Sequence, residues 1–540
     1  MKTKLNNSII MVTVCAAFLA TSAQAQSQWA KRIASTINTD DELSIGMSLD
    51  TNGNCYVTGW FDGTNNFGGV ILTNNNPGGQ DIFLAKYNSA GALQWAQQAG
   101  GASGNWNAGR GVGVDTNGYV YVTGAFYGPA TFGSFNLSAT QLKEFFLAKY
   151  NSFGTVQWVQ QSLGGYAGEG DGVYGTGLAV DGVGNCYAVG VAENGTTITF
   201  GTTNLHNANT GYYSTFLVKY DNTGALKWAQ LMGGAGEVYA TKVALDAAGN
   251  VYVRGCFTAN VTIGTSNLVS TGSPKNMFIA KFNNSGALTW VQQAIGGNVD
   301  EGGVAVDQAG NVYVTGWFTN SLNFSGISLT NAGSYDAFLA KYSSSGAIQW
   351  ARQAGGGTNA GAYVGLYWDV ALDWQGNVYP VGALSPSGSA VAAIAQYSPT
   401  GMLQWAYTAS SPPAPISSAA AKCAVDSAGN CYLAGWYYGT NTFGTNVLQP
   451  QGYWNYFLAK VAAPAPPKLG LVLSNGVPRL SFAGAISSVY SLQWSPTLVA
   501  TNTPWQTLAT LPLTNSPQLY IDTKVSSRTN RFYRAAPPAL

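Results

Sequence analysis

The chain has 540 residues, more than one hydrophobic core usually serves, so it is either divided into domains or built from repeats. Only 9% of the residues are charged, against roughly 25% in an average soluble protein, and the net charge is +1. This balance offers no basic surface for nucleic acid or for an anionic membrane. We therefore expect no nucleic acid among its partners.

The first 25 residues have the three parts of a secretory signal peptide. Lys2 and Lys4 give a basic start, residues 9–20 are apolar, and Ala23-Gln24-Ala25 is a small-residue cleavage site. The apolar stretch is too short to cross a bilayer, and we expect no transmembrane segment. The mature protein is therefore expected to be secreted or held at the cell surface.

Five cysteines follow the predicted cleavage site, and three of them replace valine in a repeated strand. We expect them to act as small buried hydrophobic residues. A bridge between Cys423 and Cys431 is the alternative, although these two would lie diagonally across a hairpin. No Cys-x-x-Cys pair is present, so we expect no structural metal. The five are Cys55, Cys186, Cys256, Cys423 and Cys431.

One stretch, clearest between residues 303 and 352, is repeated along most of the chain. It contains four short runs rich in valine and aromatic residues, each bounded by turn residues, which predicts a small antiparallel sheet. We name the runs a to d in chain order. They span residues 304–307, 311–318, 338–342 and 348–352.

The turn between runs a and b has the pattern Asp-x-x-Gly-Asn in seven copies, with Tyr119 replacing the final Asn in the second. Aspartate starts such a turn through its side chain, and glycine accepts the positive φ that follows. Run c also recurs seven times. The turn aspartates are Asp50, Asp115, Asp181, Asp246, Asp307, Asp373 and Asp426.

Run d is centred on tryptophan and has only six copies after run c, from Trp95 to Trp405. The missing seventh lies near the start of the chain, at Trp29. If the units close into a ring, this N-terminal segment supplies the outer strand of the last unit. We therefore predict an all-β fold: a seven-bladed β-propeller over residues 26–461, closed by the N-terminal strand. An open stack would leave the last sheet with an exposed edge.

The repeat Val-Asp-x-x-Gly-Asn-x-Tyr-Val-x-Gly, followed by Phe-Leu-Ala-Lys-Tyr and Gly-x-Leu-Gln-Trp-Ala, resembles the bacterial SBBP-type β-propeller repeat. The resemblance covers about residues 26–461. It implies a propeller in an extracellular setting, and the family has no catalytic residues to transfer to this chain.

The proline-rich residues 462–467 predict a stiff linker. Six alternating runs follow, which predict a small β-sandwich over residues 468–540. This part resembles, more weakly, the fibronectin-like modules that end many secreted bacterial proteins. The resemblance implies attachment or sorting, and a passive spacer is the alternative. The runs are 469–473, 478–482, 489–494, 505–511, 518–522 and 531–535.

Few residues outside the repeat have the chemistry of a catalytic or metal site. The turn aspartates and the lysines of run c recur from blade to blade, so we interpret them as structural. Residues 50–54 resemble half a calcium loop, but the twelfth position is Phe61. His206 is the only histidine and lies in a polar connection, so a serine–histidine triad is not expected. We predict no catalytic residue, cofactor or metal ion.

The b–c and d–a connections of such a blade lie on one face, and here they are long and differ between copies. The d–a connections place aromatic residues beside carboxylates, a combination that suits sugar rings. The alternative is that these aromatic residues only pack the loops onto the blades. The candidate ligand-binding residues here are Trp106, Glu237, Tyr239, Asp300 and Glu301.

A second group of candidates comes from the first position of run a. This position is glycine in four blades and Lys242, Asp369 or Lys422 in the others, which predicts three charges around the mouth of the central axis. Tyr367 and Trp368, at the end of the longest d–a loop, are expected beside them. Asp369 placed between two cations to offset their desolvation is the structural alternative to a ligand site.

Three functions remain open from these observations. The first is a secreted non-enzymatic binding or scaffold protein that holds a glycan or a surface protein on the long-loop face. The second is a secreted polysaccharide lyase or glycoside hydrolase that uses loop carboxylates. The third is a structural component of a surface layer. The low charge and the single histidine weigh against the enzyme, and the fold alone decides none of the three.

Overall fold

The computed structural model describes most of the chain as strands and turns. The described residues contain no helix that is long and apolar enough to cross a membrane. The predicted signal segment up to residue 24 and linker residues 464–467 lie outside the described residues. The described residues are 25–36, 45–74, 78–101, 106–139, 143–164, 172–193, 195, 197–207, 213–270, 275–331, 334–354, 365–385, 390–411, 417–463, 468–474, 477–483, 489–495, 506–512, 518–521 and 532–536.

The chain divides into two compact units. The larger takes in Ser27–Gly401 and Thr408–Ala462, and the smaller takes in Met1–Gln26, Met402–Tyr407 and Ala463–Leu540.

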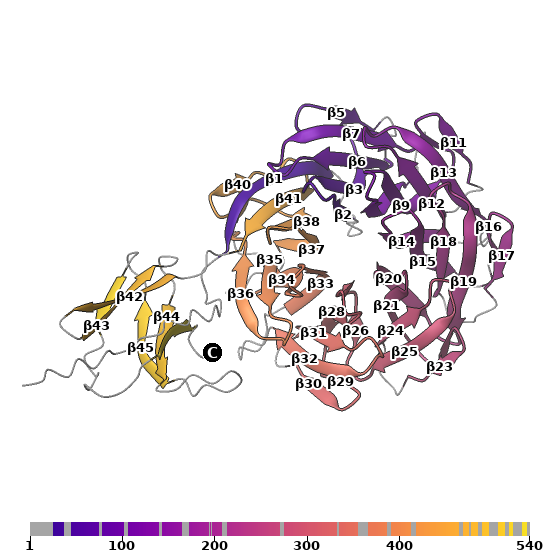
Figure 1. The fold of residues 1–540 in the computed structure, drawn as a ribbon. Helices are drawn as coiled ribbons and strands as arrows, with labels where there is room; N and C mark the ends of the chain where they lie inside the picture. Colours follow the sequence, from indigo (N-terminus) through magenta and orange to yellow (C-terminus); the bar gives the residue numbers. More distant parts are fainter. Residues whose placement is uncertain are drawn as a thin grey trace, which may run out of the picture. The chain divides into compact units, whose positions relative to one another are not determined.

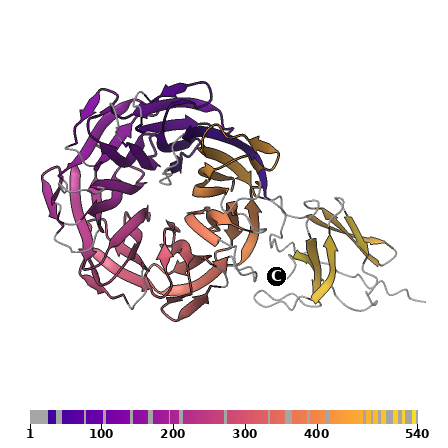
Figure 2. The same ribbon diagram turned by 180° about the vertical axis from the view of Figure 1, so that it is seen from behind.

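Seven antiparallel sheets surround a central axis, each with its first strand innermost (Figures 1 and 2). Blade 1 comprises β2 (Ile45–Leu49), β3 (Cys55–Phe61), β6 (Asp81–Tyr87) and β7 (Leu93–Ala99). Blade 2 comprises β8 (Ala108–Val114), β9 (Val120–Tyr127), β12 (Lys143–Tyr150) and β13 (Val156–Leu163). Blade 3 comprises β14 (Val173–Val180), β15 (Cys186–Glu193), β18 (Tyr213–Tyr220) and β19 (Leu226–Gly234). Blade 4 comprises β20 (Val238–Leu245), β21 (Val251–Phe257), β24 (Asn276–Phe282) and β25 (Leu288–Ala294).

The innermost strand of blade 5 is interrupted, and blade 7 draws strands from both ends of the ring. Blade 5 comprises β26 (Val299–Asp300), β27 (Val304–Val306), β28 (Val312–Phe318), β31 (Asp336–Tyr342) and β32 (Ile348–Ala354). Blade 6 comprises β33 (Gly365–Leu372), β34 (Val378–Leu384), β35 (Val391–Tyr397) and β36 (Leu403–Thr408). Blade 7 comprises β37 (Ser418–Val425), β38 (Cys431–Tyr437), β41 (Trp454–Ala462) and β1 (Gln26–Thr36).

The ring closes through strand β1, as the position of Trp29 predicts. The last blade has the strand order β1-β41-β38-β37, and Figure 1 shows the first strand of the chain lying along β41. Ile33 on β1 packs in one buried cluster with Leu458 of the last blade and Val57 of the first. The seven-bladed propeller and its N-terminal closure are therefore confirmed.

A tryptophan on each of six outer strands ties its blade to the next one. Each indole N–H donates to a backbone carbonyl in the c–d turn of the following blade, at 3.0 to 3.3 Å. The glycine of that turn is needed for two reasons. Gly91, for example, has φ +78°, and a Cβ there would lie 2.9 Å from the ring of Trp29. The pairs are Trp29–Ser89, Trp95–Ser152, Trp158–Asn222, Trp228–Asn284, Trp290–Ser344 and Trp350–Pro399.

The turn aspartates and the lysines of run c have structural contacts. Asp50 Oδ1 accepts hydrogen bonds from the backbone N–H groups of Asn52 and Asn54, which form a turn rather than a calcium loop. The Tyr56 hydroxyl donates to Asp50, and Lys86 lies 5.0 Å from the centre of the Tyr56 ring. This lysine–tyrosine contact recurs in five further blades, so the run c lysines pack against tyrosine rings within the blades.

Six blades carry an additional hairpin in the b–c connection, which we did not predict. Several of these hairpins bond to the outer strand of the preceding blade, as β16 does to β13 and β22 to β19. The hairpins are β4 (Thr64–Asn66) with β5 (Ile71–Thr73), β10 (Ala130–Phe132) with β11 (Phe135–Leu137), β16 (Thr197–Phe200) with β17 (Thr203–His206), β22 (Val261–Ile263) with β23 (Ser266–Leu268), β29 (Ser321–Phe324) with β30 (Ile327–Thr330), and β39 (Asn441–Phe443) with β40 (Asn446–Leu448).

All five cysteines after residue 25 are buried and free, as expected, so the alternative of a bridge between Cys423 and Cys431 is wrong. In the β37–β38 hairpin Cys423 lies opposite Leu433 and Cys431 lies opposite Val425. The two thiols are therefore diagonal, as predicted, and they act as small apolar residues.

The C-terminal segment forms two three-stranded antiparallel sheets. All six predicted runs are strands, and their packing into a sandwich stays a prediction. The first sheet has the order β42 (Lys468–Ser474), β43 (Val477–Ala483), β46 (Gln518–Ile521), and the second has the order β45 (Gln506–Pro512), β44 (Val489–Ser495), β47 (Phe532–Ala536).

Candidate functional site

The innermost strands begin earlier than the sequence predicts, and five of them contain a β-bulge near the start. In β33 the register shifts between Tyr367 and Asp369, so that Trp368 is the extra residue. A bulge re-aims the side chains beside it. Tyr239, Tyr367 and Trp368 therefore belong to strands, which corrects their predicted place in loops. The same shift occurs at Arg110, Thr176, Thr241 and Ala421.

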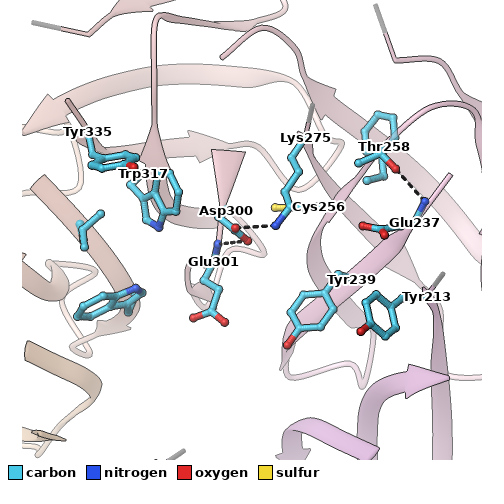
Figure 3. Close-up of a pocket in the computed structure, with 13 residues that line it drawn as sticks. Tyr213, Glu237, Tyr239, Cys256, Thr258, Lys275, Asp300, Glu301, Trp317 and Tyr335 are labelled. Carbon is cyan, nitrogen blue, oxygen red and sulfur yellow. Dashed lines mark hydrogen bonds and ion pairs between the residues drawn. The ribbon is translucent and has the colours of Figure 1, made fainter. Parts of the chain in front are cut away.

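A pocket of about 490 Å³ opens on the face from which the b–c and d–a connections leave the blades (Figure 3). Its volume lies within the range of small-molecule binding sites. The lining residues come from four neighbouring blades. They are Tyr213, Glu237, Tyr239, Cys256, Phe257, Thr258, Lys275, Asp300, Glu301, Trp317, Tyr335, Leu366 and Trp368.

Two aromatic pairs form walls of this pocket. The rings of Trp317 and Tyr335 lie 4.9 Å apart, and those of Tyr213 and Tyr239 lie 6.3 Å apart, both edge to face. Figure 3 shows the pairs on opposite sides of the view, with Asp300 and Glu301 between them. Each pair fixes its rings by mutual packing, which leaves rigid apolar surfaces toward the pocket.

The charged residues of the pocket are arranged around Asp300. Lys275 Nζ lies 2.7 Å from Asp300 Oδ2, and the Arg254 guanidinium donates to the Asp300 backbone carbonyl at 2.6 Å. Burial lowers the pKa of Lys275, but the hydrogen bond to Asp300 and the negative charge around Lys275 together outweigh this, so the pKa is raised overall. Lys275 is therefore a fixed cation. Glu301 is exposed, and Figure 3 shows its carboxylate directed away from this ion pair.

The pocket brings together five of the ten predicted site residues: Glu237, Tyr239, Asp300, Glu301 and Trp368. Sequence reasoning missed Tyr213, Lys275, Trp317 and Tyr335. These four border the b–c connections, whereas the predicted candidates come from the d–a connections and from the first position of run a. Because the b–c and d–a connections lie on the same face of the propeller, residues beside the b–c connections could have been predicted as candidates as well.

Trp106 and Tyr367 lie outside this pocket. Trp106 forms a bridge with Gln80 and is partly exposed. Tyr367 is only 1% exposed, and its hydroxyl lies 3.5 Å from that of Tyr397. Tyr367 is therefore buried within the blade beside Tyr397, and its contact with a ligand stays a prediction.

Lys242, Asp369 and Lys422 line a separate cavity of about 150 Å³ among the innermost strands. Lys242 Nζ lies 3.4 Å from Asp369 Oδ1, which gives the predicted contact between a carboxylate and a cationic neighbour. Trp368 belongs to the larger pocket and not to this cavity. Five of the ten candidates thus line the pocket and three line the cavity, whereas Trp106 and Tyr367 line neither.

Among the described residues there is no group of three or more His, Cys, Asp or Glu side chains placed to hold a metal ion. His206 ends strand β17 on the surface, where its Nδ1 lies 3.0 Å from the Thr197 hydroxyl.

Comparison with known proteins supports the propeller. A family model described as a β-propeller repeat, SBBP, matches residues 94–125, which run from strand β7 into β9. The fold is that of a repeat propeller. A curated relative, an uncharacterized WD repeat-containing protein L264 of Acanthamoeba polyphaga mimivirus, is 26% identical over 371 residues. That match covers 55% of this chain and about a quarter (26%) of the relative's length.

Solved structures that resemble the chain are distant in sequence and in geometry. One is a protein of unknown function from Dyadobacter fermentans, with 10% identity and a TM-score of 0.34, covering 80% of this chain and 99% of that one. Another is Sqt1 from Chaetomium thermophilum, with 9% identity and a TM-score of 0.36, covering 85% and 97% of the two chains. The fold assignment therefore rests on the strand pairing of this chain.

Proposed function

We propose that the protein is a non-enzymatic carbohydrate-binding propeller that works outside the cell or on its surface. The observation that carries this proposal is the pocket of about 490 Å³, with aromatic pairs on its walls and charged groups between them. Sugar rings offer apolar faces that stack on aromatic side chains and hydroxyl groups that bond to carboxylates and ammonium groups.

The arrangement of the two kinds of residue supports a sugar rather than a purely apolar ligand. Trp317 and Tyr239 present apolar surface, while Asp300 and Lys275 are already paired and so keep fixed positions. A fixed ion pair supplies acceptors and donors without the cost of ordering them on binding. Glu301 adds a second carboxylate at the open side.

The extracellular setting rests on the composition of residues 1–25, which have the basic, apolar and small-residue parts of a signal peptide. The C-terminal sheets of residues 468–540 are proposed as a module that attaches or sorts the propeller.

A hydrolase or lyase is the second candidate, and one observation favours it. The pocket holds Glu237 and Glu301 in addition to the paired Asp300, and two carboxylates are enough for glycoside hydrolysis. Glu301→Gln is the variant that separates the two functions. It abolishes product formation by an enzyme, whereas it removes only one polar contact from a binding protein.

The test is a glycan array and a polysaccharide-degradation screen on the purified protein, followed by two substitutions. Trp317→Ala should weaken binding of an array hit roughly ten- to a hundredfold, because an aromatic anchor contributes about 1–3 kcal/mol. Trp106→Ala is the matched control, since this tryptophan lies outside the pocket. An array without a hit, or unchanged binding by a folded Trp317→Ala variant, would overturn the proposal. Release of sugar products would favour the enzyme.

A further inference from the structure

The axial cavity is separate from the carbohydrate pocket and has its own charge pattern. The first position of run a is occupied by Gly46, Gly111 and Gly177 in blades 1 to 3, and all three line the cavity. A Cβ at each of them would come within 3.0 Å of the next innermost strand, so no side chain enters the cavity from these positions. Side chains enter from Lys242 in blade 4, Asp369 in blade 6 and Lys422 in blade 7. None of the lining residues is shared with the larger pocket.

The charged residues that line the cavity are Arg110, two lysines and one carboxylate. Lys242 Nζ lies 3.4 Å from Asp369 Oδ1, and the side chains of both residues are 14% exposed. The second oxygen, Asp369 Oδ2, accepts a bond from the backbone N–H of Cys423 at 3.3 Å. Both oxygens of the single carboxylate are thus engaged, and Lys422 adds a further positive charge beside them.

Positive charge is therefore in excess where solvent access is low. The pKa of Lys422 is lowered to about 7, mainly by burial and secondly by the charge of the neighbouring Lys242. The negative charges of Asp369 and Glu301 act in the opposite direction. A partly buried cation is costly unless it is paired. A second anion would remove this cost for Lys422 and would share Lys242 with Asp369.

The backbone around the cavity adds neutral donors. Each innermost strand is paired on one side only, so alternate residues direct their N–H and C=O groups toward the axis, and the N–H groups are available as donors. The cavity of about 150 Å³ compares with roughly 30 Å³ for one water molecule in the liquid, which leaves room for a tetrahedral oxyanion.

We propose that the axial cavity binds a small oxyanion, of the phosphate or sulfate class, between Lys242 and Lys422. The bound anion joins blades 4 and 7 across the axis and thereby stabilises the closed ring. This site is independent of the proposed carbohydrate function.

Isothermal titration of the full chain with inorganic phosphate and with sulfate tests the site, against chloride at equal ionic strength. We expect saturable one-to-one binding and a rise in melting temperature with either oxyanion but not with chloride. Lys422→Met should weaken binding roughly ten- to a hundredfold, which corresponds to one lost bond to a charged group. Lys227→Met, which changes an exposed lysine on β19, should bind like the wild type.

The Asp369→Asn variant should change sulfate affinity in the opposite direction from Lys422→Met. Because it removes the internal carboxylate that competes for Lys242, it should bind sulfate more tightly than the wild type. Lys422→Met is expected to fold, since it removes a buried cation together with its repulsion from Lys242 and leaves the Lys242–Asp369 ion pair in place. Absence of saturable binding by the wild type, or equal affinity in Lys422→Met and Lys227→Met, would overturn the proposal. So would weaker binding by a folded Asp369→Asn variant.

Discussion

The indole Nε1 of Trp29 donates a hydrogen bond of 3.3 Å to the carbonyl oxygen of Ser89, which joins the outer strand of the last blade to the first blade. The same contact links five other pairs of neighbouring blades. At Trp29 the contact also connects the two ends of the ring, because strand β1 pairs with β41 of the last blade.

We expect removal of residues 26–33 from the 26–461 fragment to cause a large cooperative loss of stability or aggregation. The deletion takes Trp29 and the buried Ile33 from the last blade and leaves β41 as an unpaired edge. Trp29→Ala alone should lower the free energy of unfolding by on the order of 3 kcal/mol. Urea denaturation measures both effects.

Trp374→Ala is the matched control, since this side chain is 69% exposed and should cost little. A deletion variant that melts at the wild-type temperature would show that β1 does not hold the ring closed.

We expect the propeller and residues 468–540 to unfold separately, with the main site of limited proteolysis at residues 463–467. The larger unit ends at Ala462, and a proline-rich segment follows. Brief digestion followed by mass spectrometry locates the cleavage, and calorimetry counts the transitions. Protection of this segment together with a single transition would instead indicate one cooperative unit.

The buried Glu144 should make stability depend on pH. Burial raises the pKa of this carboxyl to about 7, and the hydrogen bond from the Ser162 hydroxyl opposes the shift only in part. The ordinary value is 4.5. Between pH about 4.5 and about 7 the folded protein keeps a proton that the unfolded chain has lost. The free energy of unfolding therefore falls as pH rises, by at most about 1.4 kcal/mol per pH unit.

Glu144→Gln should remove this contribution, so that its stability gain over the wild type grows with pH across the same window. Denaturation curves at several pH values measure the difference. Phe153→Ala, at an exposed position of the same blade, is the control substitution and should show no such trend, because it removes no titratable group. A constant difference between wild type and Glu144→Gln would mean that Glu144 titrates normally.

Sulfate binding at the axis should weaken as pH rises above about 7. Lys422 then loses its proton, because burial and Lys242 lower its pKa to about 7, and neither Asp369 nor Glu301 offsets them. Sulfate keeps its charge over this range, whereas phosphate does not. Titration calorimetry at about pH 6 and about pH 8 measures the change. The Lys422→Met variant should bind sulfate weakly at both pH values. If its affinity depended on pH as much as that of the wild type, the titrating group would be a residue other than Lys422.

Much of the fold could be predicted because each blade repeats the same local chemistry. The turn aspartates fix the a–b hairpins, and the tryptophan missing after run c reappears as Trp29, which required a closed ring. The hairpins in the b–c connections were missed, although a Phe-Gly pair marks the turn in several of them, as at Phe132-Gly133 and Phe443-Gly444. Their short strands are partly stabilised by pairing with the outer strand of the preceding blade. This pairing leaves no periodic pattern in the sequence that could predict it.

The sequence by itself determined the number of blades, the closure of the ring and the face that holds Glu237, Tyr239, Asp300 and Glu301, because these follow from strand alternation. Tertiary structure decided which side chains meet. A bulge one residue long sends Trp368 to the pocket and Tyr367 into the blade, and the ring brings residues of four blades around one pocket. Bulges and contacts between blades depend on packing between strands distant in sequence, so no local pattern predicts them.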